Sequence, residues 1–270
     1  MKDINIIIVS YNSQAVLEPC LRSLLKDLIP AGGMQWQITV VDNASKDGTP
    51  AFIREQFPEV VVIEQGNLGY AGGVNRGVEA CESRYHFVLN PDTEVIEPNT
   101  IVRLVSWMDA HPKVGMVGPK LLNADGSVQD SCGRFPATLD PLLKRLFVSK
   151  YAWVKRRIAY THMRDFDHGG TQPVDWILGS AMFVRREALA QVGPMDRRFF
   201  MYFEDMDWCR RFWIQRWPVY YLHDVVISHL HKRESAKVSG AKAVFMNKLT
   251  RIHLKSWWKY FWKYRFQVGP

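Results

Sequence analysis

The feature that most constrains the fold is a series of short apolar runs that alternates with helix-like segments in the first part of the chain. The runs are expected strands, at Ile4–Val9, Gln37–Val41, Val60–Ile63, Tyr85–Leu89 and Val114–Val117. Helices are expected between them, for example at Thr49–Gln56 and Asn99–His111. Strands and helices that alternate at this spacing indicate βαβ units around a mostly parallel sheet. The sequence therefore predicts an α/β fold with helices flanking a central sheet.

The positive charge lies at one end of the chain. Residues 1–235 contain 27 of the 35 Lys and Arg and all 27 Asp and Glu, so their formal charge is zero. Residues 236–270 carry the whole net charge of +8 and no acidic residue. We therefore expect one α/β domain over 1–235 and a basic, amphipathic helical tail over 236–270.

Cysteine spacing and hydropathy exclude several classes of protein. The four cysteines are scattered without a C-x-x-C pair, which argues against a zinc site or a disulfide framework and fits a reducing cytosol. Ile4–Val9 is too short for the core of a signal peptide, and no apolar run approaches the ~18 residues of a membrane span. We expect a cytoplasmic protein that does not cross a membrane.

Two expected strands end at an aspartate. Asp42 follows the second strand, and Asn90-Pro91-Asp92 follows the fourth. In α/β folds the carboxyl ends of the strands form the rim that binds ligands. Pro91 disfavours helix in the residue before it, and the Asp92 carboxylate is a hard oxygen ligand suited to a divalent cation on a diphosphate. A turn or a helix cap explains the same residues without a ligand.

Three further segments are candidates for binding or catalysis. The glycine-rich stretch 67–77 is not G-x-G-x-x-G and follows the third strand, which disfavours NAD, although Arg76 could reach a phosphate. Acidic residues at 204, 205 and 207 are expected in the first turn of a helix, either as a preferred charge at its N-terminus or as a general base. Gly179-Ser180 could admit a ligand to the backbone, and His229 could bind a metal or lie at the surface.

Taken in order, these segments resemble a known family. The segments that carry the resemblance are IIIVSYNS, VVDNASKDGT, NLGYAGGVNRG, LNPDTEV, WILGSAMFVRREAL and VGPMDRRFFMYFEDMDWCRR, and they span residues 4–230. Their joint occurrence is similar to the family 2 glycosyltransferases of the GT-A fold. The N-P-D form, together with W-x-x-G-S and F-M-Y-x-E-D, resembles the bacterial rhamnosyltransferase branch that uses dTDP-L-rhamnose.

The resemblance implies a role for each matching residue. Asp205 is implied as the catalytic base of an inverting transfer, and Asp92 with His229 as ligands of Mg²⁺ or Mn²⁺. The implied substrate-binding residues are Ser10, Tyr11, Asn12, Asp42, Asn67, Gly69, Asn75, Arg76, Asn90, Trp176, Gly179, Ser180 and Glu204. Residues 1–98 would form the nucleotide-sugar half and residues 99–235 the acceptor half. Asn90 stands where the family usually has a first acid, so one charged metal ligand is missing.

The tail and the family resemblance together imply the partners. Basic residues at 248, 251, 255, 259 and 263 recur at helical spacing among Trp, Tyr and Phe, which suits the headgroup region of an anionic membrane. A tail helix packed on the domain is the alternative, and we expect no nucleic-acid partner. The predicted protein lies on the inner face of the cell membrane and transfers a sugar from dTDP-sugar or another nucleotide sugar to a lipid-linked glycan. Two other readings stay open, a nucleotide-dependent methyltransferase and a non-catalytic membrane-associated scaffold.

Overall fold

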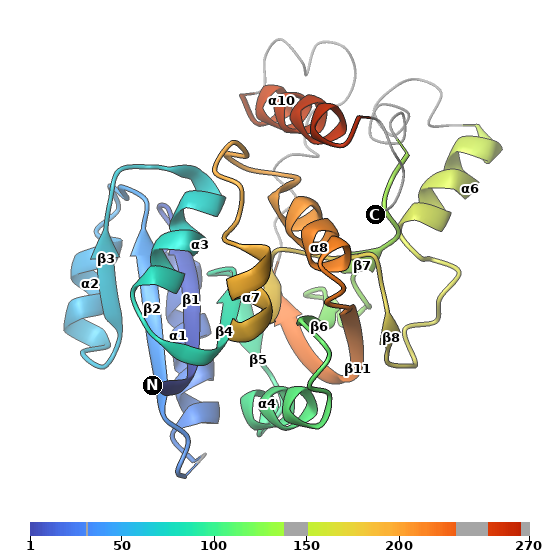
Figure 1. Ribbon diagram of the computed structural model, residues 1–270. Helices are drawn as coiled ribbons and strands as arrows, with labels where there is room; N and C mark the ends of the chain where they lie inside the picture. The colour runs from blue at the N-terminus through green and yellow to red at the C-terminus, as the bar shows by residue number, and fades with distance from the viewer. Residues whose placement is uncertain (31, 138–150, 231–247, 266–270) are drawn as a thin grey trace.

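A computed structural model describes residues 1–30, 32–137, 151–230 and 248–265. Its centre is a nine-stranded sheet in the order β3-β2-β1-β4-β10-β6-β11-β5, with β8 paired to β11 (Figure 1). The strands are β1 Lys2–Ser10, β2 Trp36–Asp42, β3 Val61–Glu64, β4 Ser83–Leu89, β5 Thr93–Val95, β6 Met116–Leu122, β8 Gln172–Pro173, β10 Ala181–Arg185 and β11 Val219–His229. The predicted α/β architecture with a central sheet is confirmed.

The sheet is parallel in its first half and mixed in its second half. Strands β1 to β4 pair in parallel, as expected. Strand β10 lies between β4 and β6 and runs antiparallel to both. It begins at Ala181, opposite Leu89 at the end of β4, so it starts at the rim and runs back along β4. The sequence did not predict this strand direction, because an apolar run carries no information about direction.

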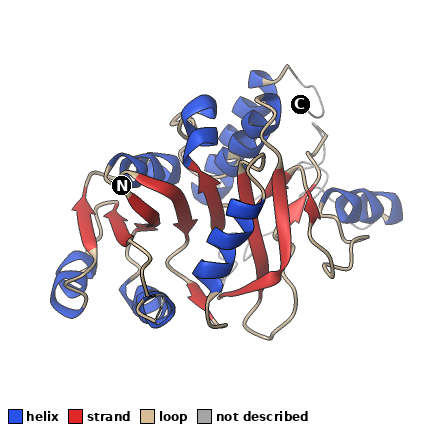
Figure 2. Ribbon diagram, turned by 60° about the horizontal axis from the view of Figure 1, so that its bottom comes forward, coloured by secondary structure: helices blue, strands red, loops and turns tan. Residues whose placement is uncertain are grey.

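Helices cover both faces of the sheet (Figure 2). Helices α1 Gln14–Leu28, α2 Thr49–Gln56 and α4 Thr100–Ala110 pack on one face, and α3 Gly69–Glu79, α7 Arg186–Val192 and α8 Glu204–Ile214 pack on the other. Alternate residues of β1 serve the two cores, with Ile4, Ile6 and Ile8 in the first and Val9 in the second. A Cβ on Gly73 of α3 would lie 2.6 Å from Val9 Cγ1, so glycine at this position allows α3 to lie close to β1.

Two short strands and two further helices lie outside the main sheet. Strands β7 Cys132–Gly133 and β9 Trp176–Ile177 form a second sheet, and helix α6 Ala152–Thr161 lies outside it. Helix α10 Lys248–Lys263 packs Tyr260 and Phe261 against the segment before α8. The remainder of the predicted tail, 236–247 and 266–270, lies outside the described residues. No helix in the described ranges is long and apolar enough to cross a bilayer.

Candidate active site

The ends of β1 and β2 form the first part of the site. The register of the sheet places Ser10 opposite Asp42, and Asn43 donates its backbone N–H to the Ser10 carbonyl at 2.8 Å. Asp42 Oδ2 accepts a hydrogen bond from the Ser45 backbone N–H at 2.8 Å. Its other oxygen, Oδ1, is buried and has no partner among the described residues. A buried acceptor without a donor is costly, so this oxygen fits a ligand that supplies an N–H or O–H.

The Ser10–Asn12 turn closes over the same rim. The Asn12 backbone N–H donates to Ser45 Oγ, and the Lys46 N–H donates to Asn12 Oδ1, each at 2.8 Å. Asn12 adopts a left-handed backbone with φ 49°, which asparagine tolerates well. The Tyr11 side chain is 56% exposed. The structure therefore brings the predicted turn and Asp42 together, with Tyr11 available to a ligand.

The N-terminus of α3 touches the segment that leads to α8. Gly69 has φ +77°, its N–H donates to Asn67 Oδ1, and a Cβ at Gly69 would lie 2.2 Å from the Phe200 carbonyl oxygen. That carbonyl accepts the Tyr70 N–H at 2.8 Å. A side chain at position 69 would therefore separate the two halves of the site.

Asp205 lies at the start of α8, next to the rim of β4 and β10. Its carboxylate accepts backbone N–H bonds from Gly179 at 3.1 Å and Met206 at 2.8 Å. The Tyr70 hydroxyl donates to the Gly179 carbonyl at 2.5 Å. Asn90 donates its backbone N–H to the Ser180 carbonyl at 3.0 Å. Residues at the end of β4, in α3, just before β10 and at the start of α8 thus lie in contact with one another.

The two neighbouring carboxyls are in different electrostatic environments. Burial raises the pKa of Glu204 well above its usual value, and the Asp205 charge raises it further. Burial also raises the pKa of Asp205, but its two backbone N–H bonds oppose that shift. Glu204 Oε2 is buried and has no partner in the described structure. Asp205 is therefore the carboxyl better suited to be an ionised base, beside a Glu204 that stays protonated to higher pH.

Tyr70 connects this cluster with Asp92. Burial is the main reason that the pKa of the Tyr70 phenol is raised, and the carboxylates of Glu204, Asp205 and Asp92 add to the shift. All three acids are therefore close enough to act on one phenol.

Asp92 and His229 meet at the ends of β5 and β11. The register pairs His229 with Thr93, and Leu230 donates its N–H to the Asp92 carbonyl at 2.9 Å. His229 Nε2 lies 3.3 Å from Asp92 Oδ1. Gln129 Oε1 lies 2.7 Å from His229 Nδ1, while the Gln129 amide donates to Asn123 Oδ1 at 3.0 Å. The Gln129 oxygen thus accepts from Nδ1–H, and Nε2 is the ring nitrogen that faces Asp92.

This pair fits a divalent cation. Two ligands about 2.1 Å from one ion lie about 3 Å apart, which matches the separation of Nε2 and Oδ1. Carboxylate suits Mn²⁺ well, and imidazole suits it less well but is tolerated. Within the described part of the chain, no group of three or more His, Cys, Asp and Glu side chains converges on one point. A cation here would therefore complete its coordination with substrate oxygens and water.

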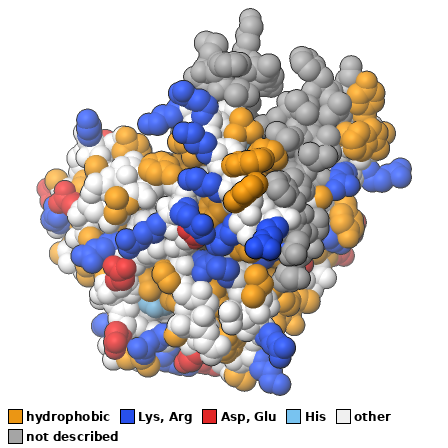
Figure 3. All heavy atoms as spheres, turned by 45° about the horizontal axis from the view of Figure 1, so that its top comes forward, with side chains coloured by type: hydrophobic (Ala, Val, Ile, Leu, Met, Phe, Trp, Pro, Cys, Tyr) orange, Lys and Arg blue, Asp and Glu red, His pale blue; other side chains and the backbone are white. Residues whose placement is uncertain are grey.

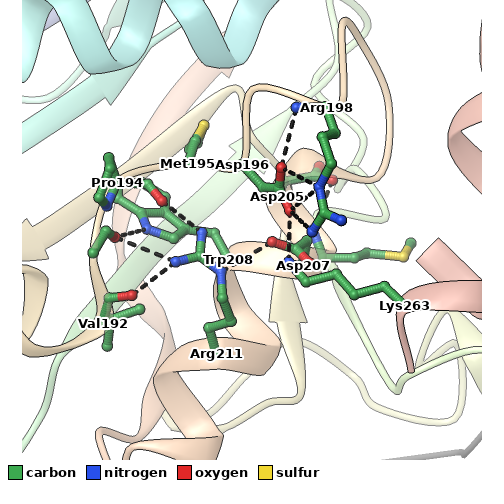
Figure 4. Close-up of polar contacts among 12 residues, drawn as sticks. Val192, Pro194, Met195, Asp196, Arg198, Asp205, Asp207, Trp208, Arg211 and Lys263 are labelled. Carbon is green, nitrogen blue, oxygen red and sulfur yellow. Dashed lines mark hydrogen bonds and ion pairs between the residues drawn. The ribbon is translucent and has the colours of Figure 1, made fainter. Parts of the chain in front are cut away.

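A cluster of ion pairs fixes the segment before Asp205. Asp207 has a fully buried side chain that pairs with Arg211 at 3.0 Å and with Lys263 of α10 at 2.6 Å. Lys263 also contacts Asp196, which binds Arg198 (Figure 4). Further contacts from α10 to this cluster and to the same segment come from Lys259 Nζ to the Arg198 carbonyl, Ser256 Oγ to the Met201 carbonyl and the Tyr264 hydroxyl to Asp207. Helix α10 thus packs on the domain with one face, and Lys259 and Lys263 of the expected basic stripe belong to that face.

Three predicted substrate-binding residues have other surroundings. Asn75 is buried and exchanges two hydrogen bonds of 2.8 Å with the backbone of Met195, which anchors the segment before α8. Arg76 is exposed in the last turn of α3 and pairs with Glu79. Trp176 is 3% exposed and donates its indole N–H to the Arg134 carbonyl. These contacts give Asn75 and Trp176 structural roles and place Arg76 at the far end of α3 from Gly69.

Sequence reasoning missed Tyr70, Gln129 and Lys263. Tyr70 lies inside the glycine-rich segment, but its partner Gly179 is 109 residues away. Gln129 lies in a stretch without regular periodicity, and Lys263 belongs to the basic stripe that suits an anionic membrane, with packing on the domain as the alternative. Of these three residues, only Lys263 could have been anticipated from the sequence. Asp207 falls at a buried position of a predicted helix, and a buried carboxylate needs a cationic partner.

Comparison with solved structures identifies the fold. A mannosyltransferase of Pyrobaculum calidifontis, solved with GDP-Man and Mn²⁺, superposes with a TM-score of 0.57 at 19% identity, covering 87% of this chain and 60% of that one. GalNAc-T7, solved with UDP, GalNAc and Mn²⁺, gives 0.66 at 14% identity, covering 97% of this chain and 48% of that one. This chain has the GT-A fold, and it spans less than two thirds of either protein.

Sequence comparison identifies the family. Residues 5–168 match the family described as Glycosyl transferase family 2, and the chain belongs to that family. The N-acetylglucosaminyl-diphospho-decaprenol L-rhamnosyltransferase of Mycobacterium tuberculosis is 28% identical over 257 residues, 89% of this chain and 83% of the relative. Rhamnosyltransferase WbbL of Escherichia coli is 23% identical over 267 residues, 94% and 91% of the two chains. The chain is a glycosyltransferase, and family membership disfavours the methyltransferase and scaffold readings.

Proposed function

We propose that this enzyme transfers L-rhamnose, with inversion, from dTDP-L-rhamnose to a hydroxyl of a lipid-linked glycan. The observation that carries the proposal is the Asp205 carboxylate, held by two backbone N–H bonds, together with the Asp92–His229 pair, whose aspartate acts on the same Tyr70 phenol as Asp205. The choice of sugar and acceptor is supported by two relatives named as rhamnosyltransferases, one of them acting on a diphospho-decaprenol lipid.

Each half of the site has a part in the reaction. Asp42 and the Ser10–Asn12 turn bind the nucleobase, and the Asn67–Gly69 turn shapes the pocket for the nucleotide sugar. Asp92 and His229 would hold Mg²⁺ or Mn²⁺, and the bound cation would supply positive charge at the diphosphate leaving group. Asp205 takes the proton of the acceptor hydroxyl as that oxygen bonds to the anomeric carbon. The bond from that carbon to the diphosphate breaks on the opposite face, and dTDP departs with the electron pair.

We further propose that the enzyme acts at the cytoplasmic face of the cell membrane, with α10 as one contact to anionic lipids. Trp258 and Trp262 of α10 are 52% and 66% exposed, and their rings stack at 5.9 Å. The other face of α10 packs against the segment before Asp205. Deletion of the tail would therefore disturb the site as well as membrane binding. The variant W258A/W262A separates these effects.

A donor screen tests the proposed reaction. The full-length protein is incubated with dTDP-L-rhamnose, UDP-sugars and GDP-sugars, with Mn²⁺ or with EDTA, and with a short-chain polyprenyl diphosphate-linked N-acetylglucosamine. We expect Mn²⁺-dependent transfer from dTDP-L-rhamnose and a product of inverted anomeric configuration. Transfer from a different donor would overturn the rhamnosyl assignment, and transfer unchanged by EDTA would overturn the metal site. The variant D205N is the inactive control.

A further inference from the structure

Helix α6 presents an aromatic and basic face outward. Trp153, Arg156, Arg157 and Tyr160 recur at helical spacing and line a surface hollow of about 370 Å³. Trp153 is 58% and Tyr160 59% exposed, whereas Val154 on the same helix is fully buried. The helix therefore packs on the domain through small and aliphatic side chains and leaves its largest rings at the surface.

The charge on this helix has one sign. Residues Ala152–Thr161 include Lys155, Arg156 and Arg157 and no acidic residue. Beyond its C-terminal end, Asp165 is engaged by Arg134 through two hydrogen bonds of 2.8 and 2.9 Å. Arg134 also lies 4.1 Å from the centre of the Tyr160 ring, so this neutral ion pair lies beside the face and leaves the net charge of the helix positive. The face is thus suited to anionic groups that lie beside an apolar phase.

Helices α6 and α10 face the same end of the molecule. Both lie at the upper end in Figure 1, and Figure 3 shows hydrophobic and basic side chains next to each other on this side. Helix α10 is also free of acidic residues, and it exposes Lys255 and Arg251 with the stacked Trp258 and Trp262. Two separate segments of the chain therefore carry the same combination of side chains to one side of the protein.

We propose that α6 is a second contact for anionic phospholipid headgroups, which forms one membrane-binding face together with α10. Trp153 and Tyr160 enter the boundary between headgroups and acyl chains, and Arg156 and Arg157 lie at the phosphates. The partner is a bilayer because its surface combines anionic headgroups with an apolar acyl region. The cations on the two helices match the headgroups, and the aromatic rings match the acyl region. The inference extends the proposed membrane association of α10 and does not depend on the identity of the sugar.

Vesicle sedimentation of the full-length protein tests this surface. The variants R156E/R157E and W153A/Y160A are compared with wild type on phosphatidylcholine vesicles that contain 30% phosphatidylglycerol, in about 0.1 M salt, and on vesicles of phosphatidylcholine. The control K26E/K113E makes the same change in charge on exposed lysines in the last turn of α1 and just after α4, at the opposite end of the molecule. We expect R156E/R157E to weaken binding to the anionic vesicles more than tenfold, W153A/Y160A to weaken it several-fold, and the control to bind as wild type. All variants should transfer sugar to a soluble acceptor at the wild-type rate, which shows that they are folded.

Each contrary result overturns a different statement. Wild-type binding by both α6 variants, together with loss of binding by W258A/W262A, would overturn the role of α6 and leave the contact of α10 in place. Failure of the wild type to bind anionic vesicles would overturn both contacts, while the donor screen would still test the enzyme. Equal loss in the K26E/K113E control would show that net charge is responsible. Oligonucleotide binding that α6 substitutions abolish, without vesicle binding, would assign the face to nucleic acid.

Discussion

The two halves of the active site hold their carboxylates by different means. Asp42 ends a parallel strand, and the register with Ser10 fixes its backbone. Asp205 follows a segment in which Tyr202 and Phe203 both have a left-handed backbone, at φ 71° and 68°. That segment is fixed by side chains, above all Lys263 of α10, which lies 56 residues beyond Asp207. The rim at Asp42, proposed to bind the nucleotide, therefore depends on the sheet, whereas the segment before Asp205, proposed to face the acceptor, depends on long-range side-chain contacts.

The comparison predicts that the two halves can be disabled separately, with the largest effect at Asp205. The substitution D205N should lower kcat about 10²- to 10⁴-fold, because it removes the general base. Affinity for dTDP, measured by calorimetry, should stay at the wild-type value. Because burial raises the pKa of Asp205 and transfer needs its ionised form, wild-type kcat should fall as the pH is lowered through that raised pKa. Turnover near the wild-type rate in D205N would remove Asp205 as the base.

A substitution at Lys263 should damage the acceptor half from a distance. Asp207 is fully buried, so K263M leaves its charge with Arg211 and Tyr264 as partners and should destabilise the protein by about 2–3 kcal/mol. Urea unfolding measures this loss, and kcat should fall while affinity for dTDP is retained. The control K255M makes the same change at an exposed position of α10 and should have little effect. Equal effects of the two variants would show that the contacts of Lys263 with Asp207 and Asp196 do not stabilise the site.

A substitution at Gln129 should weaken metal binding without loss of the ligands. In Q129L no acceptor holds the Nδ1–H of His229, and we expect about 10- to 100-fold weaker binding of Mn²⁺ in the presence of dTDP. Calorimetry measures the affinity, and H229A should weaken it further. The control Q191L removes the acceptor of the Trp217 N–H elsewhere in the fold and should bind Mn²⁺ normally. If H229A loses Mn²⁺ and Q129L does not, the orientation of the ring does not depend on Gln129.

The smallest effect is expected at Asp196, where the readout is the pH dependence of stability. Hydrogen bonds from Arg198, and then Lys263, hold the pKa of the Asp196 carboxyl well below its usual range. A lowered carboxyl pKa stabilises the fold above the unfolded-state pKa of about 3.9, and this contribution is lost as pH falls through the folded-state value. We expect D196N to cost about 1 kcal/mol at pH 7 and progressively less below pH 4. A difference from wild type that does not change between pH 7 and pH 3 would contradict this ionic account.

The same contrast explains what the sequence could predict. The positions of Asp42 and Asp92 at the rim can be predicted, because an apolar run that stops at an acid marks the end of a buried strand and the rim follows from the fold class. The acidic first turn of α8 was found because it precedes a helical pattern. The antiparallel direction of β10 and the contact of Tyr70 with Gly179 were not found, since local periodicity does not record which distant segments meet. For α10 the pattern showed an amphipathic helix and left open which face packs on the domain.

The position of α10 in the chain also sets an order of maturation. All strands of the sheet precede α10 in the sequence, and the segments made first generally fold first during synthesis. The nascent protein can therefore complete its nucleotide rim before Lys263 has been added. The contacts of Lys263 with Asp207 form last, so under the proposed roles the ability to bind a donor arises earlier in the life of each molecule than the ability to use it.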